Sequence, residues 1–366
     1  MQKKLLLISM MLIVLCSLSA VSASEINGTD DAIGVDSDVS APCDIVSASE
    51  INGTDEVDSG DLLSAPSTST VTVSTWSDLK SACTNTTQYD TIYVSGGITP
   101  PNSIGKISIS KSVTIEGLSG SYIGGTSTDN AVSVGYVPFY TTTNGLNITF
   151  KNLNFQNIKN NILIHLNGNG NYVFENCNFD NIVATAWKQS IIWLNYGTGN
   201  ITNCNFTNNK LSFGTITNFY SSSSSTVNNA RMSISDCRFT NNQGSYAPGA
   251  INNCGYMDIQ NTIFENNRAT NWAGAVLSYT YATTNINNTT FKNNKAGWNG
   301  GAIYTYSILN ISNSTFEGNN CSTNTGGGAI GATSYGSTYN ITINNYNSKE
   351  EKNTVNEKSP VLCGLG

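Results

Sequence analysis

Residues 259–276 read IQNTIFENNRATNWAGAV, and this pattern recurs along most of the chain. A large apolar residue, Ile259, precedes Asn261 and then an aromatic residue, Phe264. Apolar and polar residues alternate with a period of two on both sides of Asn261, but the phase slips by one residue there. A slip of this kind indicates two short strands joined by a sharp bend.

The aromatic residue returns at intervals that are typical of a coiled repeat. The anchors are Phe155, Phe179, Phe206, Phe239, Phe264, Phe291 and Phe316, with Tyr346 as a candidate eighth. Successive intervals are 24, 27, 33, 25, 27, 25 and 30 residues. Periods of this length indicate a solenoid, whereas a β-sandwich would need a turn about every 8–12 residues and a propeller would need blades of about 40.

An Asn or Asp stands three residues before each Phe, at the expected bend. The bend residues are Asn152, Asn176, Asn203, Asp236, Asn261, Asn288 and Asn313. Both residue types tolerate the left-handed backbone conformation that most side chains resist. We therefore expect a ladder of side chains that hydrogen-bond from coil to coil, and we expect its member Asn313 to be poorly accessible.

A second phrase, Gly-Ala followed by Ile or Val, comes after four of the anchors and begins another inward-facing strand. Its glycines, which we expect to form turns at low steric cost, are Gly249, Gly274, Gly301 and Gly328. One such coil cannot bury its own apolar face, but stacked coils share a continuous core. The sequence thus predicts an all-β fold, a right-handed parallel β-helix of about eight to nine coils.

The composition predicts that the chain is divided into four segments. Residues 1–23 begin with basic residues, continue with an apolar run, and end with a stretch of small residues up to Ala23. This arrangement predicts an export signal that is cleaved. An uncleaved membrane anchor is the alternative, and after signal removal we expect no membrane span. Residues 24–70 form an acidic spacer with an internal duplication, since residues 24–66 hold 11 acidic residues and no Lys or Arg.

The β-helix is expected over residues 71–348, followed by a C-terminal tail over residues 349–366. The stretch 75–83 reads TWSDLKSAC and predicts a short helix with Trp76, Leu79 and Cys83 on one face. A solenoid must cover its open end, so this helix is the expected N-terminal cap.

The charge and the positions of the cysteines limit which partners and ligands the chain is expected to bind. The chain has a formal net charge of −7, but residues 67–366 are nearly neutral, so we expect no basic stripe and no nucleic-acid partner. Cys177, Cys204 and Cys237 occupy one coil position, which predicts an interior stack of small apolar groups. With His165 as the single histidine, the sequence predicts no metal and no cofactor.

The repeats resemble those of a known family. Asn follows at the third position after Phe206, Phe239, Phe264, Phe291 and Phe316, and the interleaved Gly-Gly-Ala-Ile is similar to the FxxN and GGA[ILV] repeats of polymorphic outer-membrane proteins. With the export signal and the Trp-containing cap, residues 70–348 look like the adhesin-like surface proteins of methanogenic archaea. Phe155 and Phe179 depart from the motif, because Ile158 and Ile182 stand where Asn is expected.

The resemblance implies an extracellular protein, secreted or associated with the cell surface, that is structural or adhesive and not an enzyme. Its expected partners are cell-surface or wall glycans, or another cell-surface protein. Exposed aromatic residues suit stacking on sugar rings, although packing on a strand face is an equally good interpretation. The candidate sugar contacts are Tyr279, Tyr281, Trp298, Tyr304 and Tyr306.

Two alternatives remain open. A polysaccharide lyase or hydrolase of the pectin-lyase-like fold would need, on one face, either paired carboxylates or acidic calcium ligands with a catalytic Arg or Lys. Acidic residues are sparse within the coils. A surface-layer glycoprotein without a specific ligand is the other alternative, with Asn27 and Asn52 in the spacer as the best glycosylation sites.

Overall fold

The computed structural model describes residues 69–84, 89–103, 105–219, 230–323, 326–333 and 341–355. The predicted export signal, nearly all of the spacer, and the sequons at Asn27 and Asn52 lie outside the described residues. Among the helices found within these ranges, none is long and apolar enough to cross a membrane.

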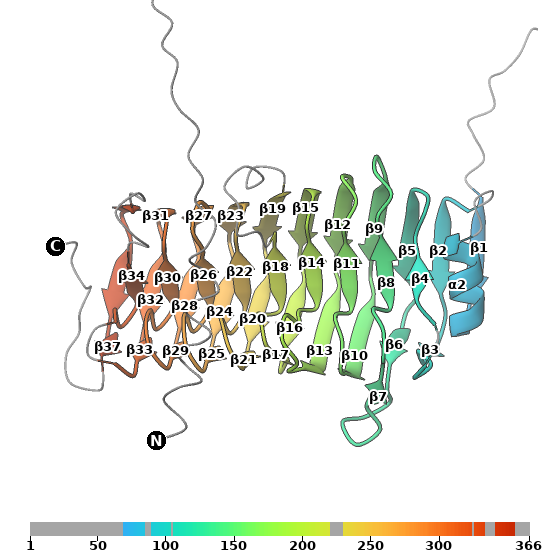
Figure 1. The fold of residues 1–366 in the computed structure, drawn as a ribbon, viewed down its shortest axis with the longest axis horizontal. Coiled ribbons are helices and arrows are strands. Elements are labelled where there is room, and N and C mark those ends of the chain that lie inside the picture. Colours follow the sequence, from blue (N-terminus) through green and yellow to red (C-terminus); the bar gives the residue numbers. More distant parts are fainter. Residues whose placement is uncertain are drawn as a thin grey trace, which may run out of the picture. The chain divides into compact units, whose positions relative to one another are not determined.

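The chain winds through three sheets in turn, and every strand pairs in parallel with its counterpart one coil away (Figure 1). The first sheet comprises β1 Thr70–Val73, β2 Thr91–Val94, β5 Val113–Gly117, β9 Asn147–Lys151, β12 Asn171–Glu175, β15 Gly197–Thr202, β19 Ala230–Ser235, β23 Tyr256–Gln260, β27 Thr283–Asn287, β31 Ile308–Ser312 and β35 Thr342–Tyr346. The third sheet comprises β4 Ile107–Ser108, β8 Phe139–Thr141, β11 Ile164–Leu166, β14 Ile192–Leu194, β18 Ile216–Asn218, β22 Ile251–Asn253, β26 Val276–Ser278, β30 Ile303–Thr305 and β34 Ile330–Ala332.

The second sheet lies between these two in each coil and consists of two strand ladders that share β10 and β13. Its strands are β3 Gly97–Ile98, β6 Tyr122–Gly124, β7 Val132–Ser133, β10 Asn154–Lys159, β13 Asn178–Ala184, β16 Asn205–Thr207, β17 Lys210–Leu211, β20 Arg238–Thr240, β21 Gln243–Gly244, β24 Ile263–Glu265, β25 Arg268–Ala269, β28 Thr290–Lys292, β29 Lys295–Ala296, β32 Thr315–Glu317, β33 Asn320–Cys321, β36 Lys349–Glu351 and β37 Thr354–Val355. The nine strands of the third sheet define nine complete coils, so the right-handed parallel β-helix of eight to nine coils is confirmed.

The anchor phenylalanines form the centre of the core. From Phe155 to Phe316 they are fully buried and stand in register from coil to coil. Their rings stack with centroid distances of 4.6–5.0 Å and interplanar angles of 1–10°. This distance matches the strand spacing of about 4.8 Å, so each coil adds one ring to a continuous column.

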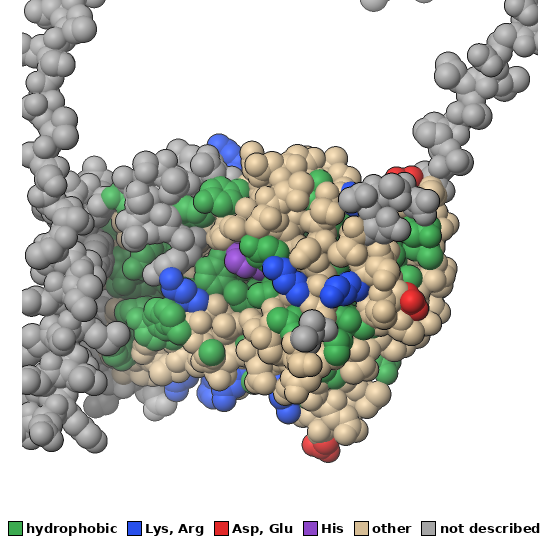
Figure 2. Space-filling view, turned by 45° about the vertical axis from the view of Figure 1, so that its right-hand side comes forward, with side chains coloured by type: hydrophobic (Ala, Val, Ile, Leu, Met, Phe, Trp, Pro, Cys, Tyr) green, Lys and Arg blue, Asp and Glu red, His purple; other side chains and the backbone are tan. Residues whose placement is uncertain are grey.

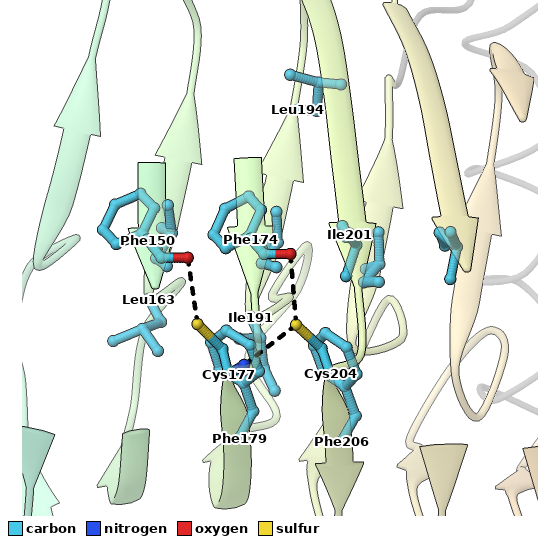
Figure 3. Close-up of a cluster of buried hydrophobic side chains, with 14 of the residues drawn as sticks. Phe150, Leu163, Phe174, Cys177, Phe179, Ile191, Leu194, Ile201, Cys204 and Phe206 are labelled. Atoms are coloured by element: carbon cyan, nitrogen blue, oxygen red, sulfur yellow. Dashed lines mark hydrogen bonds between the residues drawn. The ribbon is translucent and has the colours of Figure 1, made fainter. Parts of the chain in front are cut away.

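The predicted cysteine stack lies beside this column (Figure 3). Cys177, Cys204 and Cys237 are buried free thiols. Hydrogen bonding to the preceding cysteine of the stack, and then burial, raises the pKa of Cys204 and Cys237. The Cys204 Sγ accepts the backbone N–H of Cys177 at 3.3 Å, and the thiol of Cys177 donates to the carbonyl oxygen of Phe150 at 3.4 Å. Core packing is therefore the role of this stack.

The predicted bend residues all adopt the left-handed conformation, with φ between 47° and 56°. Their amides bond between coils, as in Asn203 Nδ2 to Asn176 Oδ1 at 2.7 Å and Asn288 Nδ2 to Asn261 Oδ1 at 2.8 Å. Asp236 accepts from Asn261 Nδ2 at 3.2 Å, but its carboxylate has no hydrogen to donate to Asn203 in the preceding coil, so the outer ladder is interrupted there. The expected inaccessibility of Asn313 is wrong, since the bend points outward and Asn313 is exposed.

A second asparagine ladder lies inside the molecule. Its members are Asn209, Asn242, Asn267, Asn294, Asn319 and Asn353. All are 4% exposed or less, and each except Asn353 donates to the Oδ1 of the next coil at 2.9–3.0 Å. Each amide also donates to a phenylalanine carbonyl, such as Phe239 O for Asn267 at 2.9 Å. All except Asn353, which follows Glu350, are the asparagines of the FxxN motif, and the role of the ladder is to satisfy buried backbone groups.

The repeated glycines permit close stacking of backbones. Gly249, Gly274, Gly301 and Gly328 lie in bends just before strands of the third sheet, as expected. None of them has a positive φ, so these bends do not require glycine's left-handed conformation. A Cβ at Gly274 would overlap the carbonyl oxygen of Gly301, and a Cβ at Gly328 would lie 2.8 Å from the Thr354 nitrogen. The next coil leaves no room for a side chain at this position.

The predicted cap is helix α2, Trp76–Thr84. Thr75 caps its N-terminus by accepting the Asp78 N–H at 3.2 Å. Trp76, Leu79 and Cys83 are buried as expected, and the Trp76 indole donates to Gly105 O at 2.7 Å. The helix thus seals the apolar core at the N-terminal end of the stack.

The coils continue beyond the expected end at residue 348. Strands β36 and β37 pair with β32 and β33, so part of the expected tail belongs to the solenoid. Tyr346 is not an anchor, because it pairs with Ser312 in the first sheet and is 65% exposed. Glu350 takes the anchor position opposite Phe316, and burial raises the pKa of its carboxyl. The bend residue Asn347, at φ 52°, sets this register three residues earlier.

Candidate functional site

The outer face of the third sheet carries a row of mainly aromatic and apolar side chains. The first residue of every strand in this sheet belongs to the apolar core, so by strand alternation the second residue faces outward. The register aligns these outward residues, which are Tyr140, His165, Trp193, Thr217, Asn252, Leu277 and Tyr304. Trp193, Leu277 and Tyr304 form apolar clusters separate from the main core, which confirms that they pack outside it.

A second aromatic row comes from the turns that lead into the third sheet. It consists of Trp187, Phe213, Tyr246, Trp272 and Trp298, each seven or eight residues after an anchor Phe. Trp187 meets Tyr246 edge to face at 4.5 Å, Tyr246 meets Trp272 at 5.5 Å, and Trp272 meets Trp298 at 5.8 Å. The contacts hold these rings as a continuous platform across successive coils.

The two rows enclose a groove of about 130 Å³. Its lining residues are Trp187, Phe213, Tyr246, Ala247, Asn252, Trp272, Leu277 and Tyr279. Trp187 and Trp298, at 55% and 52% exposed, stand open to solvent at its border, whereas Tyr246, Trp272 and Tyr279 are half-buried. Rings that present a face to water above a shallow apolar floor suit a ligand with both apolar and hydroxyl-bearing surfaces.

Charged and polar groups extend the face toward the N-terminal coils, where hydrophobic side chains surround the histidine (Figure 2). Lys106 Nζ lies 3.7 Å from the centre of the Tyr140 ring, a cation–π contact. His165 Nε2 is 3.1 Å from Asn195 Nδ2, and Asn195 Oδ1 accepts the Trp193 indole N–H at 2.8 Å. Burial, and to a lesser degree Lys106, lowers the pKa of His165 to about 4. The imidazole is therefore neutral at pH 7.

The structure separates the five predicted sugar contacts into two groups. Tyr279 lines the groove, and Trp298 and Tyr281 are 52% and 37% exposed. Tyr304 and Tyr306 are only 3% and 9% exposed, so the expectation that they present their faces to solvent is wrong. Their rings pack 4.8 Å apart, with Tyr279 a further 5.4 Å from Tyr306. They support the platform from beneath.

Trp187, Phe213, Tyr246 and Trp272 were not predicted as site residues. A signal for them exists in the sequence, because an aromatic residue seven or eight positions after an anchor recurs in five coils. Their position in the turn before the third sheet explains why strand alternation does not reveal them.

The carboxylates of the coils lie on other faces. Glu175 pairs with Lys151, Glu317 pairs with Lys292, and Glu265 pairs with Arg238. The part of the chain that the structure describes contains no group of three or more His, Cys, Asp or Glu side chains arranged to hold a metal. The lining of the aromatic groove likewise includes no acidic or basic residue among those described.

A family model described as the right handed beta helix region matches residues 139–307. No curated protein matches the sequence. Among solved structures, a pectate lyase variant from Xanthomonas campestris is 16% identical, with a TM-score of 0.37 and coverage of 68% of this chain and 79% of that chain. An alginate lyase from Paenibacillus sp. str. FPU-7 is 13% identical, with a TM-score of 0.34 and coverage of 78% and 99%.

The Escherichia coli protein ybhc is 11% identical, with a TM-score of 0.34 and coverage of 79% and 86%. The matched region of the family model spans β8 to β30. The family match and the parallel register of successive coils agree that this chain folds as a right-handed parallel β-helix.

Proposed function

We propose that this chain is an exported, surface-associated or secreted β-helix protein that binds glycans through the aromatic face of its third sheet. The observation that carries the proposal is the platform of Trp187, Tyr246, Trp272 and Trp298, whose rings touch from coil to coil beside a groove. Aromatic rings bind the apolar faces of sugars, while neighbouring polar groups accept and donate hydrogen bonds.

The residues of the groove favour binding of a glycan without its cleavage. Glycoside hydrolysis requires a pair of carboxylates that flank the scissile bond. The acidic residues Glu175, Glu265 and Glu317 are engaged in ion pairs on the other two sheets. Incubation with the bound polysaccharide should therefore release no reducing or unsaturated ends, and reproducible release by pure protein would replace adhesion with catalysis.

Glycan binding can be tested with the purified chain and a panel of neutral polysaccharides such as cellulose, xylan and chitin. Trp298→Ala and Trp187→Ala should each weaken the retained binding by about tenfold, because stacking on one ring is worth about 0.5–1.5 kcal/mol beyond the area it buries. Tyr346→Ala removes an aromatic side chain of comparable exposure from the first sheet and is the matched control. An equal loss in the control, or no binding to any polymer, would refute the proposal.

A further inference from the structure

A row of positively charged side chains runs along the second sheet, on a different face from the aromatic platform. The register places Lys159, Val183, Lys210, Gln243, Arg268, Lys295 and Asn320 at one position of successive coils. Four of these seven are cations and none is acidic. This corrects the expectation that the coils carry no basic stripe, which rested on net charge alone.

Lys159, Lys210, Arg268 and Lys295 form no ion pair with a carboxylate of the residues that the structure describes. The ion pairs found among the described residues involve Lys151, Arg238 and Lys292 instead. Lys210 and Arg268 are exposed, and Lys159 and Lys295 are half-exposed. The positive charge of the row is therefore available to an external anion.

A polar groove of about 620 Å³ accompanies the row. Its lining residues are Asn208, Asn241, Gln243, Asn266, Arg268 and Asn293. The four asparagines occupy the bend between the two ladders of the second sheet, at φ 53–56°, and are exposed. They repeat once per coil, so the groove presents one amide at intervals of about 4.8 Å.

Some of these amides retain hydrogen-bonding capacity. Asn208 donates to Asp180 at 3.0 Å, and Asn241 donates to Asn208 at 3.3 Å. The side-chain amides of Asn266 and Asn293 make no hydrogen bond to another described residue. The amides of Asn266 and Asn293 therefore each offer two donor hydrogens and an acceptor oxygen to a ligand beside Arg268 and Lys295.

We propose that this second-sheet groove binds a linear polysaccharide that carries carboxylate groups, such as a polyuronate. Amides suit sugar hydroxyls, and the cations of the row suit the carboxylates of successive sugar units. A nucleic acid fits less well, because its backbone carries one charge per about 3.4 Å of strand whereas four cations here cover about 24 Å, or five coil spacings. The lining residues also include no aromatic ring on which a base would stack.

The decisive experiment compares two double variants with equal charge change. Arg268→Gln with Lys295→Gln removes two cations from the groove, and Arg231→Gln with Lys151→Gln removes one Arg and one Lys from the first sheet. Binding of polygalacturonate is measured by calorimetry at about 0.01 M and about 1 M NaCl, where the screening length falls from about 30 Å to 3 Å.

At low salt the groove variant should bind about tenfold more weakly than the unaltered chain, and the first-sheet variant less than about twofold more weakly. The difference should disappear at high salt. Absence of polygalacturonate binding by the unaltered chain, or an equal loss in both variants, would overturn the assignment. Tighter binding of single-stranded DNA through the same residues would overturn the ligand class.

This site is independent of the aromatic platform, so the two proposals can fail separately. The groove variant should keep its binding to neutral polysaccharides, and Trp298→Ala should keep its binding to polygalacturonate. Parallel loss of both kinds of binding in either variant would show that one surface serves both ligands and would contradict a separate anionic site.

Discussion

At the scale of single residues, Asn267 illustrates how the core tolerates polar groups. Its amide donates to Phe239 O and to Asn294 Oδ1, and its Oδ1 accepts from the backbone and side chain of Asn242. The asparagine side chains are buried, and each partner lies in the preceding or the following coil. The column therefore satisfies the backbone at a bend that no water reaches.

Replacement of Asn267 by Ala should reduce the free energy of unfolding by about 3 kcal/mol or more, because several buried donors and acceptors lose their partners at once. Urea denaturation followed by circular dichroism measures this change. Asn266→Gly is the control, since Asn266 is exposed at φ 56° and glycine adopts that conformation without strain. Equal stability of the two variants would show that the buried ladder contributes little.

His165 makes the stability of the folded chain depend on pH. Its pKa is about 4 in the folded protein, below the ordinary value of 6.5. Between these values the unfolded chain binds more protons, so stability falls as the pH is lowered. The contribution amounts to about 2 kcal/mol at pH 5 relative to pH 7.

His165→Gln should remove this contribution. The loss of thermal stability between pH 7 and pH 5, followed by calorimetry, should be smaller in the variant than in the unaltered chain by about 2 kcal/mol. Because carboxylates titrate equally in both proteins, the difference isolates the imidazole. Equal pH dependence would mean that folding does not lower the pKa of His165.

At the scale of strands and turns, the spacing of Asn and Phe was sufficient to predict the repeat. The three-residue interval from bend to anchor holds from Asn152 and Phe155 onward, and it places the bend and the core column correctly in seven coils. At the last coil the interval from Asn347 leads to Glu350, whereas the aromatic character of Tyr346 misled the prediction. Backbone conformation is thus a stronger constraint on register than the identity of the buried side chain.

The surfaces were harder to predict than the core. Strand alternation distinguishes inward from outward positions, but it does not show that turn residues cover an outward residue such as Tyr304. The basic row was equally hidden, because Lys210, Arg268 and Lys295 are separated by 58 and 27 residues and align only when coils of unequal length are stacked. Which side chains align on a surface depends on the register between coils, and that register depends on where each insertion lies.

At the scale of the whole β-helix, each coil contacts mainly its two neighbours, so stability should be close to a sum over coils. Deletion of residues 265–291 removes one full repeat and joins Phe264 to Lys292 in the same register. We expect the shortened chain to fold cooperatively, with a urea m-value reduced in proportion to the lost surface.

Deletion of residues 265–278 removes part of a coil and should instead prevent folding, because the following strands would meet the wrong sheet. Circular dichroism and analytical gel filtration distinguish the two outcomes. If both deletions folded equally well, stacking in register would not govern the architecture.

The spacing of the coils also limits what either surface can recognise. Rungs repeat at about 4.8 Å, and a polymer whose own repeat differs from this length drifts out of step with the rings or cations as it extends. Contacts that match at one coil are then offset several coils later. Each surface should therefore bind a short oligomer well, and its affinity should increase little for longer chains. It should also discriminate among polymers by the length of their monomer unit.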